Sequence, residues 1–251
     1  MSHGSVCELA YCRSCINVRK CVVPAKRVGA KADRLPVETH YRSLSQNALR
    51  LLILALALVT VPLVTRLPQW VVWENGPVEN AQAIVLLFGA IVAGLSAARA
   101  RTREARAFWL AAAPLWLIFF GRELSWGAVF LTPLDMTPEG PVFSSHALFY
   151  KPVVHPAVGL LIAFSLYQLF VRRGIRLLAN VHRSGRFPFF ELVVAAIGFI
   201  VSTATEGHAH LSLPLTAGPA QIAEECAELV AYLALLSGQW RLLGHAAPQT
   251  A

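Results

Sequence analysis

The chain has 251 residues, of which 56% are hydrophobic and 14% are charged, and its mean hydropathy is +0.54. Soluble domains usually carry about 25% charged residues. This composition therefore excludes a disordered chain, a coiled coil and a nucleic-acid-binding domain of ordinary solubility. It favours an integral membrane protein. The net charge of +8 is interpreted below from the position of each charge.

The first 46 residues are polar and basic and show no helical or strand periodicity, which predicts a disordered cytoplasmic tail. Four cysteines lie in it, at positions 7, 12, 15 and 21. Their spacing allows zinc or iron–sulfur ligation, but the loop that wraps such a cluster is missing. We expect reduced thiols in a solvated tail, or an extension translated from a misassigned start.

Six apolar runs follow, each close to the roughly 20 residues that a membrane-spanning helix needs. They cover residues 47–66, 79–98, 107–131, 152–171, 188–206 and 219–243. The third and the sixth contain charged residues, so they count as spans only if these side chains face protein or water. The sequence predicts an all-α bundle of six transmembrane helices over residues 47–243, followed by a short cytoplasmic tail at 244–251.

The basic residues alternate between the predicted loops. With the N-terminus inside the cell, 19 of the 22 lysines and arginines fall in cytoplasmic segments. The positive-inside rule expects this asymmetry, so we predict that both termini are cytoplasmic and that the chain is a multi-pass protein of the bacterial inner membrane. The expected partner is the lipid bilayer, with other membrane subunits as candidates, and nucleic acid is not expected.

The acidic residues gather on the opposite side, where nine of 14 lie at or near the predicted outer face. A charge near the bilayer centre costs roughly 2.5–3.5 kcal/mol on insertion scales, so each intramembrane charge needs an explanation. The candidate site residues are Arg122, Glu123, Glu206, His208, His210, Glu224, Glu225 and Glu228. Glu228 and Tyr232 continue the helical stripe that starts at Glu224.

Four interpretations of this site remain open. Arg122 is the one cation that lies away from the ends of the apolar runs, so it can pair with Glu224 or Glu228 as a salt bridge that fixes helix packing. A chain of protonatable carboxylates for ion or proton movement is a second interpretation. In a third, haem is held by His155 and by His208 or His210.

The fourth interpretation is a divalent metal site, with zinc or iron as the expected ion, because both accept mixed imidazole and carboxylate ligands. Its candidate ligands are Glu206, His208, His210, Glu224 and Glu228. If the site is catalytic, its candidates are Arg122, Glu123 and Glu224. We find no phosphate-binding glycine loop, no Gly-x-Ser-x-Gly turn and no His-Glu-x-x-His pair, and expect no organic cofactor site.

Three short segments resemble a group of poorly characterised bacterial membrane proteins. They are WENGPVENAQA at residues 73–83, GRELSWG at residues 121–127 and the Glu-rich start of the last helix at residues 224–229. The second is similar to the group's Glu-Glu-x-Ser-Trp-Gly segment, but has Arg122 in place of an acid and Ala128 where glutamine is expected. The resemblance spans roughly residues 48–243 and implies a common fold, without an activity.

The leading functional hypothesis is a polar site near the periplasmic face that binds a divalent metal or a small polar or lipid-derived ligand. A membrane-embedded metal-dependent hydrolase is one alternative. A structural or assembly subunit, whose charges only form packing salt bridges, is another. An ion- or proton-coupled transporter is the third, although an inverted repeat would distribute the polar residues over both sides of the membrane.

Overall fold

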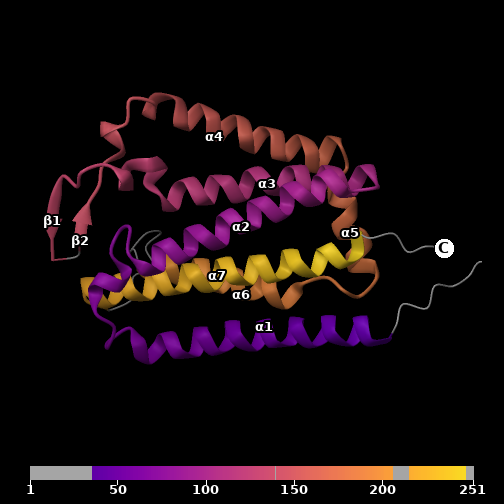
Figure 1. Ribbon diagram of the computed structural model, residues 1–251, viewed down its shortest axis with the longest axis horizontal. Coiled ribbons are helices and arrows are strands. Elements are labelled where there is room, and N and C mark those ends of the chain that lie inside the picture. The colour runs from indigo at the N-terminus through magenta and orange to yellow at the C-terminus, as the bar shows by residue number, and fades with distance from the viewer. Residues whose placement is uncertain (1–35, 139, 206–214, 247–251) are drawn as a thin grey trace, which may run out of the picture. The chain divides into compact units, whose positions relative to one another are not determined.

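The helices of the chain run back and forth between two ends (Figure 1). The computed structural model describes residues 36–138, 140–205 and 215–246. Within these ranges the fold is all-α, as predicted, apart from a short antiparallel hairpin of β1 (Asp135–Thr137) and β2 (Gly140–Val142). The cysteine-containing segment before residue 22 lies outside the described residues. Of the predicted tail at 244–251, residues 244–246 belong to the last helix and the rest lies outside the described residues.

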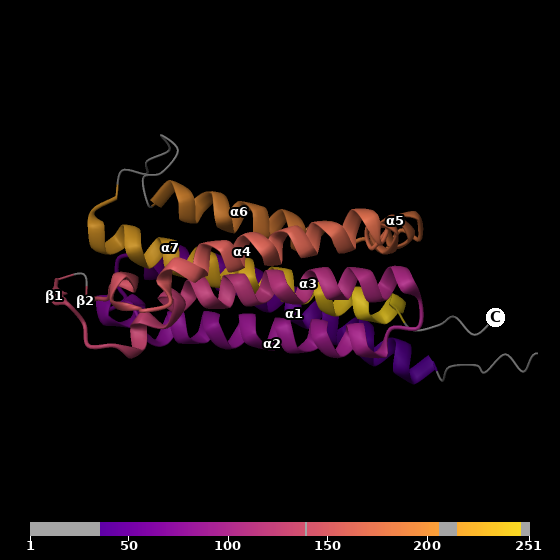
Figure 2. The same ribbon diagram turned by 90° about the horizontal axis from the view of Figure 1, so that it is seen from above.

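The longer helices lie alongside one another, and a shorter one crosses at one end of the bundle (Figure 2). The helices are α1 (Pro36–Leu63), α2 (Pro77–Arg99), α3 (Arg103–Glu123), α4 (Lys151–Leu166), α5 (Ile175–Arg183), α6 (Phe189–Thr205) and α7 (Ala217–Ala246). Short 3₁₀ turns at Gln69–Val72, Ser125–Phe130 and Ser145–Ala147 and a π turn at Tyr167–Val171 complete the described elements. The crossing helix is α5, between the end of α4 and the start of α6.

Local sequence signals explain where several helices begin. Pro77 opens α2, where its fixed φ suits a helix and its missing N–H costs nothing. Thr102 caps α3, because its side-chain oxygen accepts a hydrogen bond from the Ala105 amide at 3.2 Å. The α4 helix opens with a proline at its second position.

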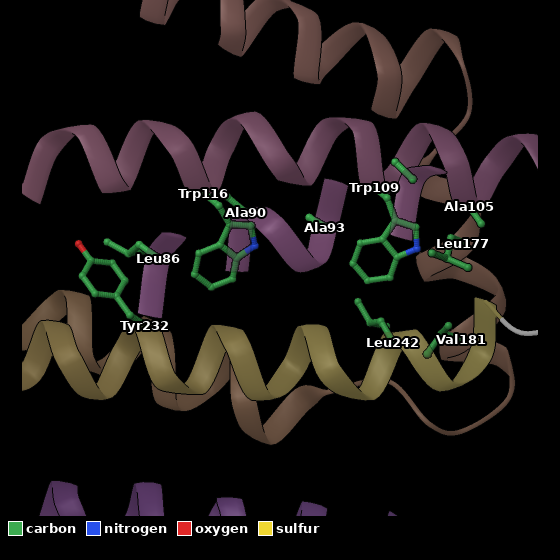
Figure 3. Packing of buried hydrophobic residues seen from close by; sticks show 11 residues of the cluster. Leu86, Ala90, Ala93, Ala105, Trp109, Trp116, Leu177, Val181, Tyr232 and Leu242 are labelled. Atoms are coloured by element: carbon green, nitrogen blue, oxygen red, sulfur yellow. The ribbon is translucent and has the colours of Figure 1, made fainter. Parts of the chain in front are cut away.

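Helix α7 lies at the centre of the bundle, packed against α1, α2 and α6, while α3 joins α2 to α4. Trp109 and Trp116 extend from α3 into the space between α2 and α7, where they meet Leu86 and Leu242 (Figure 3). Small residues allow the closest approaches. A Cβ atom at Gly198 of α6 would lie 2.8 Å from the Ala227 carbonyl oxygen of α7.

Among the described residues, two helical segments are long and apolar enough to cross a bilayer, Gln69–Arg99 and Lys151–Val171. Two further apolar helices, 47–63 and 189–205, are shorter. The prediction of six spans is therefore not confirmed by length and hydropathy alone. Helices α3 and α7 are long, but they carry charges whose partners are described below.

Three boundaries differ from the sequence prediction. Helix α1 begins at Pro36, inside the segment expected to be irregular up to residue 46. Helix α3 ends at Glu123, although the apolar run continues to Leu131, because residues 125–127 adopt a positive φ. Residues 175–183 form α5 instead of a loop, with Leu177 and Val181 buried one turn apart.

Candidate functional site

The candidate site is centred on the first half of α7, where Glu224, Glu225, Glu228 and Tyr232 follow one another. Glu228 is 4% exposed and Tyr232 is fully buried. Glu224 lies one turn before Glu228 and is half-buried. The site is completed by side chains from α2, α3 and α6, so four helices meet there.

Arg122 at the end of α3 forms an ion pair with Glu228, with 2.5 Å between its Nη2 atom and Oε1 of the carboxylate. The same oxygen accepts a hydrogen bond from the Ser202 hydroxyl of α6 at 2.8 Å. Arg122 also lies 3.6 Å from its neighbour Glu123. These contacts tie α3, α6 and α7 together around one carboxylate. The predicted pairing of Arg122 with a glutamate of the last helix is present.

Glu123 is buried beside the same pair and meets the Tyr232 hydroxyl. That hydroxyl lies 2.7 Å from an oxygen of Glu123 and 3.4 Å from an oxygen of Glu228. A hydroxyl has a single proton to donate, and the shorter contact indicates that Glu123 receives it. Tyr232 thus separates two carboxylates that would otherwise face each other directly.

Helix α2 contributes two polar residues, Glu79 and Gln82, that did not stand out in the apolar run of the sequence. The Gln82 amide nitrogen donates to the Glu225 carboxylate at 3.0 Å and to its backbone carbonyl at 2.8 Å. The Gln82 amide oxygen is buried and has no hydrogen-bond partner among the described residues. One turn earlier, Glu79 is 9% exposed and accepts a hydrogen bond from the Asn75 amide.

We call the group formed by Glu79, Glu123, Glu225 and Glu228, together with Gln82, Arg122 and Tyr232, the outer acid cluster. Its four carboxylates interact electrostatically with one another. Among the residues that the structure describes, Arg122 is the one cation paired within it. Low-dielectric surroundings make this excess of acid costly unless protons or a cation neutralise it.

The turn after α3 determines how Arg122 and Glu123 are presented. Ser125, Trp126 and Gly127 have φ values of 44°, 57° and 99°. Trp126 folds back over Gly121, where a Cβ atom would lie 2.5 Å from its ring, and its carbonyl accepts a hydrogen bond from Tyr150 at 2.7 Å. Positive φ at non-glycine residues costs about 1–3 kcal/mol each and tends to occur at functional sites.

This geometry gives GRELSWG a structural explanation. The glycines admit the tryptophan ring and the turn, and the Ser125 hydroxyl donates to Glu74 at 2.6 Å. Glu74 also accepts from the Phe143 amide at 3.3 Å, which links the loop before α2 to the segment after the hairpin. The motif ends α3 abruptly and leaves Arg122 and Glu123 in its last turn.

The predicted metal ligands are only partly described. Glu206, His208 and His210 lie outside the described residues. Glu228 is already engaged in an ion pair with Arg122 and a hydrogen bond from Ser202. No group of three histidine, cysteine, aspartate or glutamate side chains within 36–138, 140–205 and 215–246 could hold a metal ion. His155, a predicted haem ligand, is exposed on α4.

Sequence reasoning missed Glu79, Gln82 and Ser202 as members of the site. The first two had a detectable signal, since polar residues three positions apart at the start of an apolar helix share one face. Ser202 had none, because an isolated serine in a membrane helix commonly bonds to its own backbone.

A second ionic group lies at the opposite end of the bundle. Glu191 of α6 is fully buried and contacts two arginines. Arg50 of α1 lies 2.8 Å from it and Arg241 of α7 lies 3.0 Å from it. The sequence placed these arginines among the cytoplasmic charges, but they join α1, α6 and α7 in what we call the inner ion cluster.

No family, no curated protein and no solved structure matches this chain in the three comparisons made. The resemblance based on GRELSWG therefore stays a prediction. Its function has to be argued from its own residues.

Proposed function

We propose that the chain is a six-span protein of the bacterial inner membrane, with the ends of α1 and α7 that carry Arg50 and Arg241 toward the cytoplasm. Support comes from the outward faces of the helices. Leu58 of α1, Ile84 of α2 and Leu160 of α4 are 72%, 69% and 72% exposed. Soluble monomers rarely expose apolar patches of more than a few hundred Å². Surrounding lipid would cover these faces.

Helix dimensions agree with this arrangement. At about 1.5 Å per residue, the 21 residues of α3 extend roughly 31 Å, close to the thickness of a hydrocarbon core. On α7 the two ionic groups are attached at Glu228 and Arg241, about 20 Å apart along the axis. The inner ion cluster would thus lie at one interface, and the outer acid cluster would lie inside the outer leaflet.

Within that frame we propose that Glu225 and Gln82 of the outer acid cluster bind a cation that reaches them from the periplasmic side. Because the described residues contain no group of three histidine, cysteine or acidic side chains that could hold a metal ion, water would have to supply the other ligands. The observation that carries the proposal is the excess of acid around a buried, unpartnered acceptor oxygen on Gln82. A buried acceptor without a donor costs about 1–3 kcal/mol, and a bound cation would satisfy it together with Glu225. Arg122 is half-exposed at the cluster and would border the access route.

The chemistry of the donors favours a hard cation. The described donors are carboxylate, amide and phenol oxygens, which suit calcium or magnesium. Zinc or iron binding would require the imidazoles of His208 and His210, in line with the metal set predicted from sequence. The competing function is a purely structural one, favoured by the way Arg122 links α3, α6 and α7.

The proposal is tested on the full chain in lipid nanodiscs, by following the melting temperature after EDTA treatment and then with calcium, magnesium or zinc added. We expect one ion to raise it for the wild type and for Glu104→Gln, a glutamate at the other end of α3. Glu225→Gln keeps a partner for Gln82 but removes a charge, so it should lose this response without losing stability in EDTA.

The outcomes separate the alternatives. A response to calcium or magnesium supports an oxygen-ligand site, and a response to zinc alone supports the histidine-containing set. If no ion raises the melting temperature of the wild type, or if Glu225→Gln responds as the wild type does, cation binding is wrong and the structural role is the better account.

A further inference from the structure

An apolar cavity of about 250 Å³ lies between α3, α5, α6 and α7, and none of its lining residues belongs to the outer acid cluster. Its wall is almost entirely hydrophobic, with aromatic rings from α3 on one side and aliphatic side chains from α6 and α7 on the other. The residues that define its length are Phe119 toward the outer acid cluster and Leu178 and Phe187 toward the inner end.

The cavity opens sideways between α3 and α6. Leu115 of α3 and Leu192 of α6 line it and are 36% and 42% exposed, whereas Trp109 and Trp116 behind them are buried. At its outer end Phe119 stacks on Phe199 of α6, with ring centroids 6.1 Å apart. The opening therefore faces the lipid in the proposed arrangement, and the aromatic pair closes it toward the periplasm.

The polar groups of the wall are mostly satisfied within the protein. The Trp116 indole N–H donates to Gln239 at 2.5 Å, and the Gln239 amide donates to the Gly89 carbonyl at 2.9 Å. The Trp109 indole nitrogen is buried without a partner among the described residues. Because the accessible wall offers almost no polar surface, an apolar chain is the occupant that fits it.

A group of exposed arginines lies on the stretch of chain that also supplies the inner lining residues Leu178 and Phe187. The arginines are Arg172, Arg173, Arg176, Arg183 and Arg186, on α5 and the segments that flank it. None of them takes part in the ion pairs found among the described residues. The nearest acid in sequence, Glu191, is already paired with Arg50 and Arg241.

Helix α5 connects the two features. Leu177 and Val181 anchor it to the bundle, Leu178 lines the cavity, and Arg176 and Arg183 face outward. This is the pattern of a helix that lies in a membrane interface, with arginines at the depth of the lipid phosphates. Arg186 directly precedes Phe187, which lines the cavity, so one of the arginines lies next to a cavity residue in the chain.

We propose that this site binds an anionic phospholipid of the inner leaflet, with one acyl chain in the cavity and the phosphate on the α5 arginines. The inference rests on the six-span arrangement but not on cation binding at the outer acid cluster. Phe119 also packs against Tyr232, with centroids 5.9 Å apart, so the end of the acyl chain would lie beneath the aromatic rings that support Glu123.

The test compares the full chain in nanodiscs of phosphatidylcholine with and without a small fraction of phosphatidylglycerol. We expect the anionic lipid to raise the melting temperature by about 5 °C. Inorganic phosphate at the same concentration should have no effect, which separates a lipid from a free anion. Phosphatidylglycerol with brominated acyl chains should quench tryptophan fluorescence more than brominated phosphatidylcholine does.

Two variants assign the effect to the site. Ala112→Phe fills the cavity, and its matched control Ala163→Phe makes the same change on the exposed surface of α4. Replacing Arg176, Arg183 and Arg186 by glutamine removes the phosphate contacts and leaves the cavity intact. We expect the lipid response to disappear in Ala112→Phe and in the triple variant and to persist in the control.

An equal response to both lipids in the wild type would overturn the proposal. So would an undiminished preference for phosphatidylglycerol in the triple arginine variant, which does not depend on the folding of Ala112→Phe. The lipid experiment is performed in EDTA, so its outcome does not depend on whether the outer acid cluster binds a cation.

Discussion

Arg122 determines how the buried acids of the outer acid cluster are tolerated. It neutralises Glu228 directly and lies beside Glu123, so a single guanidinium serves two carboxylates. Its own side chain is 49% exposed, whereas that of Glu228 is 5% exposed. The pair is therefore asymmetric. The buried Glu228 carboxylate needs Arg122 to neutralise its charge, whereas water can solvate the exposed part of the Arg122 guanidinium without Glu228.

We predict that Arg122→Met destabilises the protein by about 2 kcal/mol, because it leaves a buried carboxylate without a cation. The figure is below that for a fully buried pair, since water screens the exposed arginine. The double variant Arg122→Met/Glu228→Gln should recover more than half of the loss. Unfolding by sodium dodecyl sulfate in mixed micelles measures both, with Arg101→Met, an exposed arginine in the turn between α2 and α3, as the control. Equal losses in the single and double variants would contradict the interpretation.

Sequence reasoning identified this pair because charges in apolar runs are rare and therefore conspicuous. Arg122 was the one basic residue away from the ends of those runs, and Glu224 and Glu228 of the last helix were its two possible partners. Gln82 escaped notice because an uncharged amide barely changes the hydropathy of its helix. Its importance comes from the tertiary contact with Glu225, which a single sequence does not reveal.

At the scale of helices, close packing depends on residues without bulky side chains. Gly198 lets α6 approach the backbone of α7, and Gly89 of α2 makes room for the ring of Trp116, which a Cβ atom would approach within 2.6 Å. In the proposed membrane arrangement, such van der Waals contacts would supply much of the association, because lipid offers no hydrophobic driving force between helices.

We predict that Gly198→Ala destabilises the protein by about 1–3 kcal/mol, because the new methyl group meets a backbone carbonyl that cannot rotate away. Gly94→Ala on α2 is the matched control, since nothing lies within 4 Å of its Cβ position. It should leave the protein unchanged or stabilise it by up to about 1 kcal/mol, because alanine is the better helix former. The same mixed-micelle unfolding compares the two, and similar values for both would show that the α6–α7 contact is looser than described.

The helices themselves were largely predictable, and their ends were less so. Four apolar runs correspond to helices within a few residues at both ends, whereas α1 begins well before its run and the run that contains α3 extends past the end of that helix. The signal for that end was Gly127 in an apolar context, which was outweighed by the hydrophobic residues after it. Helix α5 was missed because its arginines concealed the one-turn spacing of Leu177 and Val181.

At the scale of the whole molecule, the two ionic groups occupy opposite ends of the bundle. The outer acid cluster joins α2, α3, α6 and α7, and the inner ion cluster joins α1, α6 and α7. Every described helix that contributes to the central packing is thereby attached by at least one polar contact. Helix α4 has a different role, since it packs mainly on α3 and exposes most of its surface.

We predict that the β-hairpin faces the periplasm and that the α2–α3 turn and α5 face the cytoplasm. Single cysteines, introduced into a variant in which the native cysteines are replaced, test this orientation. Asp135→Cys in the hairpin should react with a membrane-impermeant maleimide in intact spheroplasts. Arg101→Cys, between α2 and α3, and Arg183→Cys, at the end of α5, should react in inverted vesicles instead. Labelling of all three from the same side would exclude the six-span arrangement, whatever the outcome of the ligand experiments.

The order in which the chain is synthesised determines when the ion pairs of Glu191 can form. In the six-span arrangement, Arg50 enters the membrane with the first helix, long before Glu191 arrives with α6, and Arg241 follows last of all. The Arg50 side chain would therefore remain at the interface without a counter-ion until Glu191 has been synthesised. Arg122 does not lack a counter-charge in this way, because the neighbouring Glu123 is inserted together with it in α3. In the six-span arrangement, Arg50 would thus stay without a counter-ion until α6 is made, whereas Arg122 would have Glu123 beside it from the start.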